Sequence, residues 1–226
     1  MMTPAEQPST AASTLLIATG NPHKLEEIRA VLEPLGIHAL GLADLPNAPP
    51  GGYAEPVEDA DSFLGNATIK ARAYAAATGR LCLADDAGLE VDALCGEPGV
   101  HSAYYAGPFD DGAPREERDR ANNDKLLAAL AHLPEGDPGR SARFVCVMAA
   151  AEPSGRIVAN SRGEFPGSIT SSPRGSNGFG YDPLLQLPDD PRTSAELSPE
   201  EKNARSHRGA AARAIAPKLR EVFAAG

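Results

Sequence analysis

A short apolar run that gives way to an amphipathic helix is the feature that most constrains the fold of this chain. The run TLLIAT, Thr14 to Thr19, is rich in strand formers and ends at the turn cluster Gly20-Asn21-Pro22. Apolar residues then recur at helical spacing, at Leu25, Ile28, Leu32 and Leu35, until Gly36 ends the helix. A strand, a turn and a helix in this order predict an α/β protein.

Strands and helices alternate in the first half of the chain, and strands pair as hairpins later. The further predicted strands are 37–42, 80–86, 90–94, 142–151, 155–164 and 167–170. The further predicted helices cover about 62–78 and 115–133. Another helix starts at Ser198 to Glu201 with Ser198 as its cap, and a last helix runs from about Arg208 and is kinked or divided by Pro217. We therefore expect a mixed sheet flanked by helices, formed by residues 14–226 as a single domain, with residues 1–13 as a disordered tail.

Charge and composition restrict the partners. The formal net charge of -10 excludes broad binding to nucleic acid or to an anionic membrane, because both require a basic surface. No stretch approaches the roughly 20 apolar residues of a membrane span. The three cysteines include no C-x-x-C pair and residues 1–13 do not resemble a signal peptide, so we expect the reducing cytoplasm. An anionic substrate would then need a local basic cluster or a bound divalent cation.

Two segments could serve the phosphates and the cation of such a substrate. TGNPHK, Thr19 to Lys24, lies where a strand meets a helix N-terminus, whose free N–H groups favour phosphate; the alternative is a turn in which Asn21 caps the helix. Asp85-Asp86 follows an apolar strand, and with Glu58 it could hold Mg²⁺; the alternative for a bare pair is a solvated acidic turn.

Two later segments could serve the base and add positive charge. In GFGYDP, Gly178 to Pro183, glycines permit close approach while Phe179 and Tyr181 offer flat faces for a purine; a structural turn is the alternative. EKNARSHRG, Glu201 to Gly209, supplies Lys202, His207 and Arg208, unless it is only an exposed basic helix end. Together the four segments match what metal-assisted attack on a nucleoside triphosphate requires.

The motifs resemble the inosine triphosphate pyrophosphatase family, which removes dITP, ITP and XTP from nucleotide pools. The resemblance runs from about Leu15 to Phe223 through the ordered blocks ATGNPHKLEEI, EDADSFLGNATIKA, ADDAGLEVDALCGEPGVHSA, FVCVMA, GSNGFGYDP and AELSPEEKNARSHRG. It implies a two-lobed α/β fold with a cleft between the lobes, a homodimer, and hydrolysis to the monophosphate and pyrophosphate.

The resemblance also implies a role for each matching residue. Asp86 would be the proton acceptor, supported by Asp85, and Glu58 with Asp86 would hold Mg²⁺. The substrate would be bound by Thr19, Gly20, Asn21, Pro22, His23, Lys24, Ala87, Phe179, Gly180, Tyr181, Asp182, Lys202, His207 and Arg208.

Three positions depart from the family pattern. Ala87 stands where the family usually has Ser, Gly65 where Glu commonly precedes the Asn, and Tyr104 where Arg is common. A related pyrophosphatase acting on modified pyrimidine or methylated nucleotides is one alternative to a purine enzyme. A nucleotide sensor without turnover is another, and it predicts binding that survives Asp86→Asn.

Overall fold

The sheet is mixed, as predicted. The computed structural model describes residues 13–110 and 112–225. Six strands lie in the order β2-β1-β3-β4-β5-β6, with β1 parallel to β2 and β3 and all later pairs antiparallel. The strands are β1 Ser13–Ile17, β2 Ile37–Gly41, β3 Cys82–Val91, β4 Ser141–Ala151, β5 Ile157–Ile169 and β6 Leu185–Gln186. The predicted tail lies outside the described residues except for Ser13, which begins β1.

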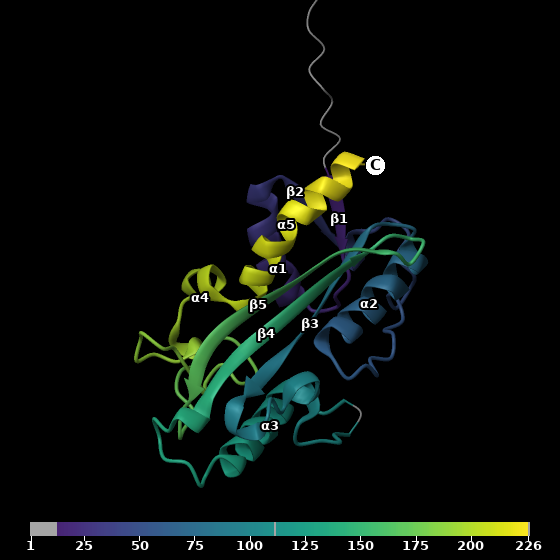
Figure 1. Cartoon of the computed structure of the whole chain (residues 1–226). Coiled ribbons are helices and arrows are strands. Elements are labelled where there is room, and N and C mark those ends of the chain that lie inside the picture. The colour runs from purple at the N-terminus through teal and green to yellow at the C-terminus, as the bar shows by residue number, and fades with distance from the viewer. Residues whose placement is uncertain (1–12, 111, 226) are drawn as a thin grey trace, which may run out of the picture.

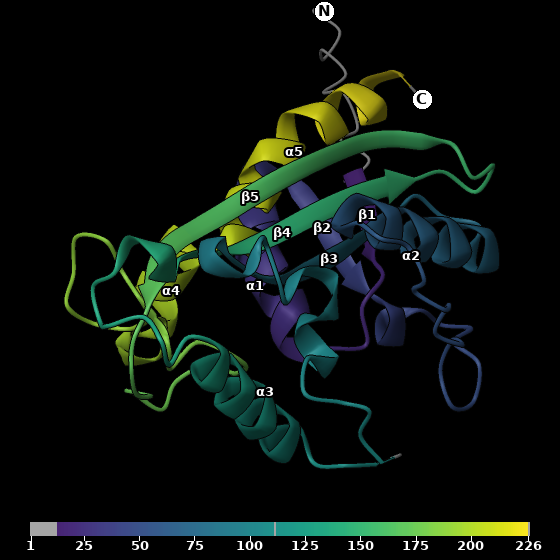
Figure 2. The same cartoon turned by 60° about the horizontal axis from the view of Figure 1, so that its bottom comes forward.

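Helices cover both faces of this sheet (Figure 1, Figure 2). They are α1 Pro22–Leu32, α2 Phe63–Thr78, α3 Arg115–Ala129, α4 Pro199–Arg205 and α5 His207–Ala225. The helices α1 and α5 lie together on one face, and α2 lies on the other. Within the described ranges, no helix is both long enough and apolar enough to cross a membrane.

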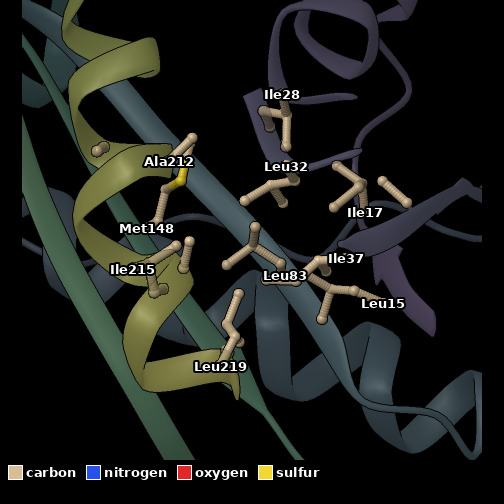
Figure 3. Close-up of a cluster of buried hydrophobic side chains, with 14 of the residues drawn as sticks. Leu15, Ile17, Ile28, Leu32, Ile37, Leu83, Met148, Ala212, Ile215 and Leu219 are labelled. Atoms are coloured by element: carbon tan, nitrogen blue, oxygen red, sulfur yellow. The ribbon is translucent and has the colours of Figure 1, made fainter. Parts of the chain in front are cut away.

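Alternation along β1 explains why the sheet has two buried faces. Successive side chains of a strand point to opposite faces. Leu15 and Ile17 therefore pack with α1 and α5, in the cluster drawn in Figure 3, whereas Leu16 packs with α2. All three side chains are buried, so the continuous apolar run in the sequence corresponds to a strand covered on both sides.

A second core makes the sheet two-lobed. The long strands β3, β4 and β5 extend past β1 and β2, and at their far end they carry α3 (Figure 1). Leu126 of α3 and Leu130, which directly follows α3, pack there against Leu89 and Phe144 of the strands. The two cores share these three strands, which confirms the predicted two-lobed α/β architecture.

Two predicted boundaries are wrong, and one of the two alternatives at Pro217 is excluded. Residues 90–94 do not form a separate strand, because β3 continues to Val91 in unbroken register with β4. Residues 155–164 and 167–170 join in the single strand β5; at Pro166 this strand pairs with β4 alone, and an edge position tolerates a residue without an N–H. Pro217 does not divide the last helix, which is one helix packed through Ile215 and Leu219. The capping box of Ser198 is confirmed.

Candidate active site

The cleft between the lobes begins where β1 ends. β1 pairs with β3 only at Cys82 and Leu83, so from Asp85 onward one edge of β3 has no parallel partner. Beside this edge lies a cavity of about 640 Å³. Its lining includes most of the predicted site: Lys24, Glu58, Asp86, Ala87, Phe179, Gly180, Tyr181, Asp182, Lys202, His207 and Arg208. Five separate segments of the chain thus converge on one space.

The turn before α1 borders this cavity rather than lining it. Thr19, Gly20, Asn21, Pro22 and His23 are absent from the described lining, although Gly20 lies beside Glu55, which does line it. Asn21 accepts a hydrogen bond from the backbone N–H of His23 at 3.0 Å, so it is a helix cap, as the alternative interpretation held. Phosphate binding by these five residues stays a prediction.

Asp85 and Asp86 do not form an acidic turn at a strand end. They lie within β3, opposite Met148 and Val147 of β4, so their side chains point to opposite faces of the sheet. The antiparallel ladder with β4 carries the strand through both residues, which the apolar pattern alone could not reveal. The two carboxylates therefore have different partners and different chemistry.

Asp85 anchors a buried network of charges. Its carboxylate is 3.0 Å from Lys24 Nζ and 3.4 Å from Arg208 Nε, and Arg208 Nη1 donates to Glu27 at 2.6 Å. Burial alone would raise the pKa of Asp85, but Lys24 and Arg208 hold it well below its ordinary value. Asp85 is therefore ionised, and it joins α1, β3 and α5 behind Lys24 and Arg208, which line the cavity.

Asp86 faces α2 instead. Asn66 Nδ2 donates to it at 3.1 Å, and Lys70 Nζ lies 3.5 Å from Asp86 and 2.8 Å from Glu58. Burial raises the pKa of Asp86, against the opposing effect of Lys70. A carboxylate with a raised pKa accepts a proton more readily, as a general base must.

The predicted metal ligands fit a divalent cation. Glu58 and Asp86 share one ammonium group, that of Lys70, so the space between them already suits positive charge. In the described part of the chain, no group of three or more His, Cys, Asp or Glu side chains could hold a metal. Two carboxylates, completed by water and substrate oxygens, are the donor set that Mg²⁺ commonly takes.

Lys202 and the glycine loop, residues 178–183, form another wall of the cavity. Lys202 Nζ is 2.6 Å from Asp182, which also accepts from the backbone N–H of Phe179 at 2.8 Å. Gly178 has φ +77°, and a Cβ there would collide with the Asp182 carboxylate, so only glycine permits this closure. Phe179 is half-buried beside the cavity. Tyr181 is buried, and its hydroxyl donates to a backbone carbonyl at 2.9 Å, so it holds the loop.

His207 and Arg208 are buried at the start of α5, not exposed at a helix end. His207 stacks on Phe144 with ring centroids 5.2 Å apart. Burial, followed by the charges of Arg208 and Lys202, lowers the pKa of His207 well below its ordinary value. A neutral imidazole therefore lines the cavity, and within the described residues its Nδ1 has no hydrogen-bond partner.

Comparisons with known proteins identify the family. A model of the Ham1 family matches residues 15–218. The chain belongs to the Ham1 family. It is 46% identical over 205 residues to a dITP/XTP pyrophosphatase of Exiguobacterium sp., covering 91% of this chain and 96% of that protein. A dITP/XTP pyrophosphatase of Corynebacterium efficiens is also 46% identical, over 92% of this chain and 98% of its own length.

Solved structures of Ham1 proteins share the fold. A HAM1 protein from Coxiella burnetii has a TM-score of 0.76 at 38% identity, covering 92% of this chain and 98% of that one. A nucleoside-triphosphatase and dITP/XTP pyrophosphatase from Mycobacterium abscessus has a TM-score of 0.65 at 42% identity, covering 94% and 98%. The family resemblance inferred from the motifs is thereby confirmed.

Several residues at the Ham1 cleft escaped the sequence analysis. Asn66 and Lys70 are four residues apart on α2, so they share a helical face toward Asp86. Their spacing within the EDADSFLGNATIKA block was a usable signal. Arg115 and Arg118 line the cavity from α3, where a charged helix start reads as a solvated surface until the fold brings it to the cleft.

Proposed function

We propose that this Ham1-family chain hydrolyses nucleoside triphosphates with a non-standard purine base, dITP, ITP and XTP, to the monophosphate and pyrophosphate. The observation that carries the proposal is the convergence of Lys24, Lys70 and Lys202 with the base candidate Asp86 on one cavity of an otherwise acidic protein. The names of the relatives, at 42–46% identity, support the same activity. Removal of these nucleotides keeps their bases out of DNA and RNA.

Asp86 is the proposed general base. It accepts a proton from a water molecule that attacks the α-phosphorus, and the bond from that phosphorus to the bridging oxygen of pyrophosphate breaks. Glu58 and Asp86 would hold Mg²⁺, which when bound neutralises phosphate charge and helps the leaving group depart. Lys24 binds phosphate charge, and Asp85 keeps Lys24 in place at 3.0 Å.

Selection of the base rests on donors near the glycine loop. Inosine and xanthine carry a 6-oxo group, which accepts hydrogen bonds where the amino group of adenine cannot. Backbone N–H groups of the loop, Lys202 and Arg208 are the proposed donors, and Phe179 offers a face for stacking. Adenine nucleotides would leave buried donors without partners, which costs about 1–3 kcal/mol for each such group.

The remaining expectations follow from this activity. The substrates belong to the nucleotide pool, so we propose a cytoplasmic enzyme. Its three cysteines are unpaired, in keeping with a reducing compartment. We also propose a homodimer, as the resemblance implies.

A substrate panel tests the proposal. Purified protein with Mg²⁺ is given dITP, XTP, dATP, dGTP, dTTP, dUTP and modified pyrimidine triphosphates, and phosphate is measured with and without added inorganic pyrophosphatase. We expect phosphate from dITP and XTP only when the second enzyme is present, and none with EDTA. Preference for a pyrimidine substrate, or phosphate release without the coupling enzyme, would reject the proposed reaction.

A further inference from the structure

Among the described residues, one cation that lines the cleft differs from the others. Five of the described cations that line the cavity are paired with carboxylates, in the pairs Lys24–Asp85, Lys70–Glu58, Arg115–Asp119, Lys202–Asp182 and Arg208–Glu27. Arg118 also lines the cavity, yet its side chain has no ion pair or hydrogen bond within residues 13–110 and 112–225. Its Nε is buried without a partner, and its guanidinium lies 6.0 Å from the ring centroid of Tyr104.

A buried guanidinium N–H without an acceptor is costly. The face of an aromatic ring alone does not compensate for the hydration that this N–H loses. Charged donors form the stronger hydrogen bonds, so leaving one unpaired costs more free energy. Among the described residues no carboxylate forms an ion pair with Arg118, so an acceptor can reach it from solution through the cavity. A planar fork of donors suits the oxygens of a phosphate group.

We propose that Arg118 binds the β- or γ-phosphate of the substrate; the inference rests on the proposed function. These two phosphates carry most of the negative charge of dITP, whereas its hypoxanthine base is neutral near pH 7. A cation without a counter-ion gains most from the charged end. Arg118 therefore acts on the part that leaves as pyrophosphate.

The neighbouring arginine is committed elsewhere. Arg115 lies 4.0 Å from the ring centroid of Phe179 and 3.7 Å from Asp119, whose carboxylate also accepts from the backbone N–H of Gly180 at 2.8 Å. Arg115 and Asp119 thus hold the glycine loop against α3, while Arg118, one turn further along, stays available.

Tyr104 supports the same assignment. This position, where the family resemblance expects Arg, carries a neutral and 62% exposed side chain. Arg118 extends over it from α3, the helix at the far end of β3 to β5 (Figure 1). A neutral side chain at position 104 adds no competing charge beside Arg118.

The test compares Arg118→Gln with Arg120→Gln. Arg120 is exposed on the same helix and does not line the cavity, so its loss controls for net charge and helix propensity. With Mg²⁺ present, the Kd of inorganic pyrophosphate, the Ki of dIMP and the KM for dITP are measured. For Arg118→Gln we expect the pyrophosphate Kd and the dITP KM to rise about tenfold or more, the size of one charged hydrogen bond. The Ki of dIMP should change less than about twofold.

Arg118→Lys keeps the charge and should recover part of the affinity, and thermal denaturation verifies that each variant folds. A pyrophosphate Kd equal to that of Arg120→Gln overturns the proposal, as does a loss confined to dIMP, which would place Arg118 at the nucleoside. Tight pyrophosphate binding that depends on Arg118, in a protein that cleaves no triphosphate, would support this inference while rejecting the proposed function.

Discussion

Replacing Asp85 with Asn tests whether one buried carboxylate joins α1, β3 and α5 behind the cleft. The Asp85 side chain is 2% exposed and contacts Lys24 at 3.0 Å and Arg208 at 3.4 Å, whose side chains are 21% and 3% exposed. Asn keeps the size and removes the charge. Both cations then lose a partner, but they differ in how easily water can replace it.

The expected cost follows from that difference. Removing one partner of a buried ion pair costs about 3–5 kcal/mol, because the other charge stays buried. Lys24 can regain water, and Arg208 keeps Glu27 at 2.6 Å, so we expect the lower end, about 3 kcal/mol. Lys24→Gln leaves Asp85 with Arg208 and should cost only about 1 kcal/mol. Asp85→Asn should therefore lower the free energy of unfolding more than Lys24→Gln does.

Urea denaturation followed by circular dichroism at pH 7.5 measures these free energies of unfolding. The double variant of Asp85 and Lys24 should cost less than the sum of the single variants, because they share one contact. Asp92→Asn removes the exposed partner of Arg143 and serves as control, with a loss below about 1 kcal/mol. An Asp85→Asn variant within about 1 kcal/mol of the parent would refute the reasoning, as would a larger loss from Lys24→Gln.

Three further predictions concern the cleft. Asp86→Asn should abolish dITP turnover without lowering the urea midpoint, because burial already disfavours the ionised form; parent-like turnover would remove the base role. Gly178→Ala should lower stability and raise the KM for dITP more than Gly180→Ala does. Both glycines have positive φ, but only a Cβ at position 178 would meet the Asp182 carboxylate. Equal effects of the two substitutions would contradict this. Burial lowers the pKa of His207, so the unfolded chain binds the proton more readily and stability should fall as pH drops below about 6.5. Between pH 7.5 and pH 5.5 the free energy of unfolding should decrease less for His207→Asn than for the parent protein. Equal decreases would exclude His207 as the cause.

The local pattern of the sequence was sufficient for most of the elements and for the type of sheet. The continuous apolar run Leu15 to Ile17 and the helical spacing of Ile28 and Leu32 are properties of neighbouring residues, so they could be read without the fold. The same holds for the caps of α1 and α4, where Asn21 and Ser198 accept from N–H groups a few positions away. The motif blocks indicated the family for the same reason, because each is a contiguous segment.

Only the tertiary structure decided which residues share the cleft and what each can do there. Asp85 and Asp86 are adjacent in sequence, yet the pleat of β3 sends one toward Lys24 and Arg208 and the other toward Lys70. Arg118 resembles any exposed helix charge until α3 is packed beside β3. Burial, pairing and the loss of water depend on residues distant in the chain, and these quantities determine whether a charge binds substrate, holds a neighbour or accepts a proton.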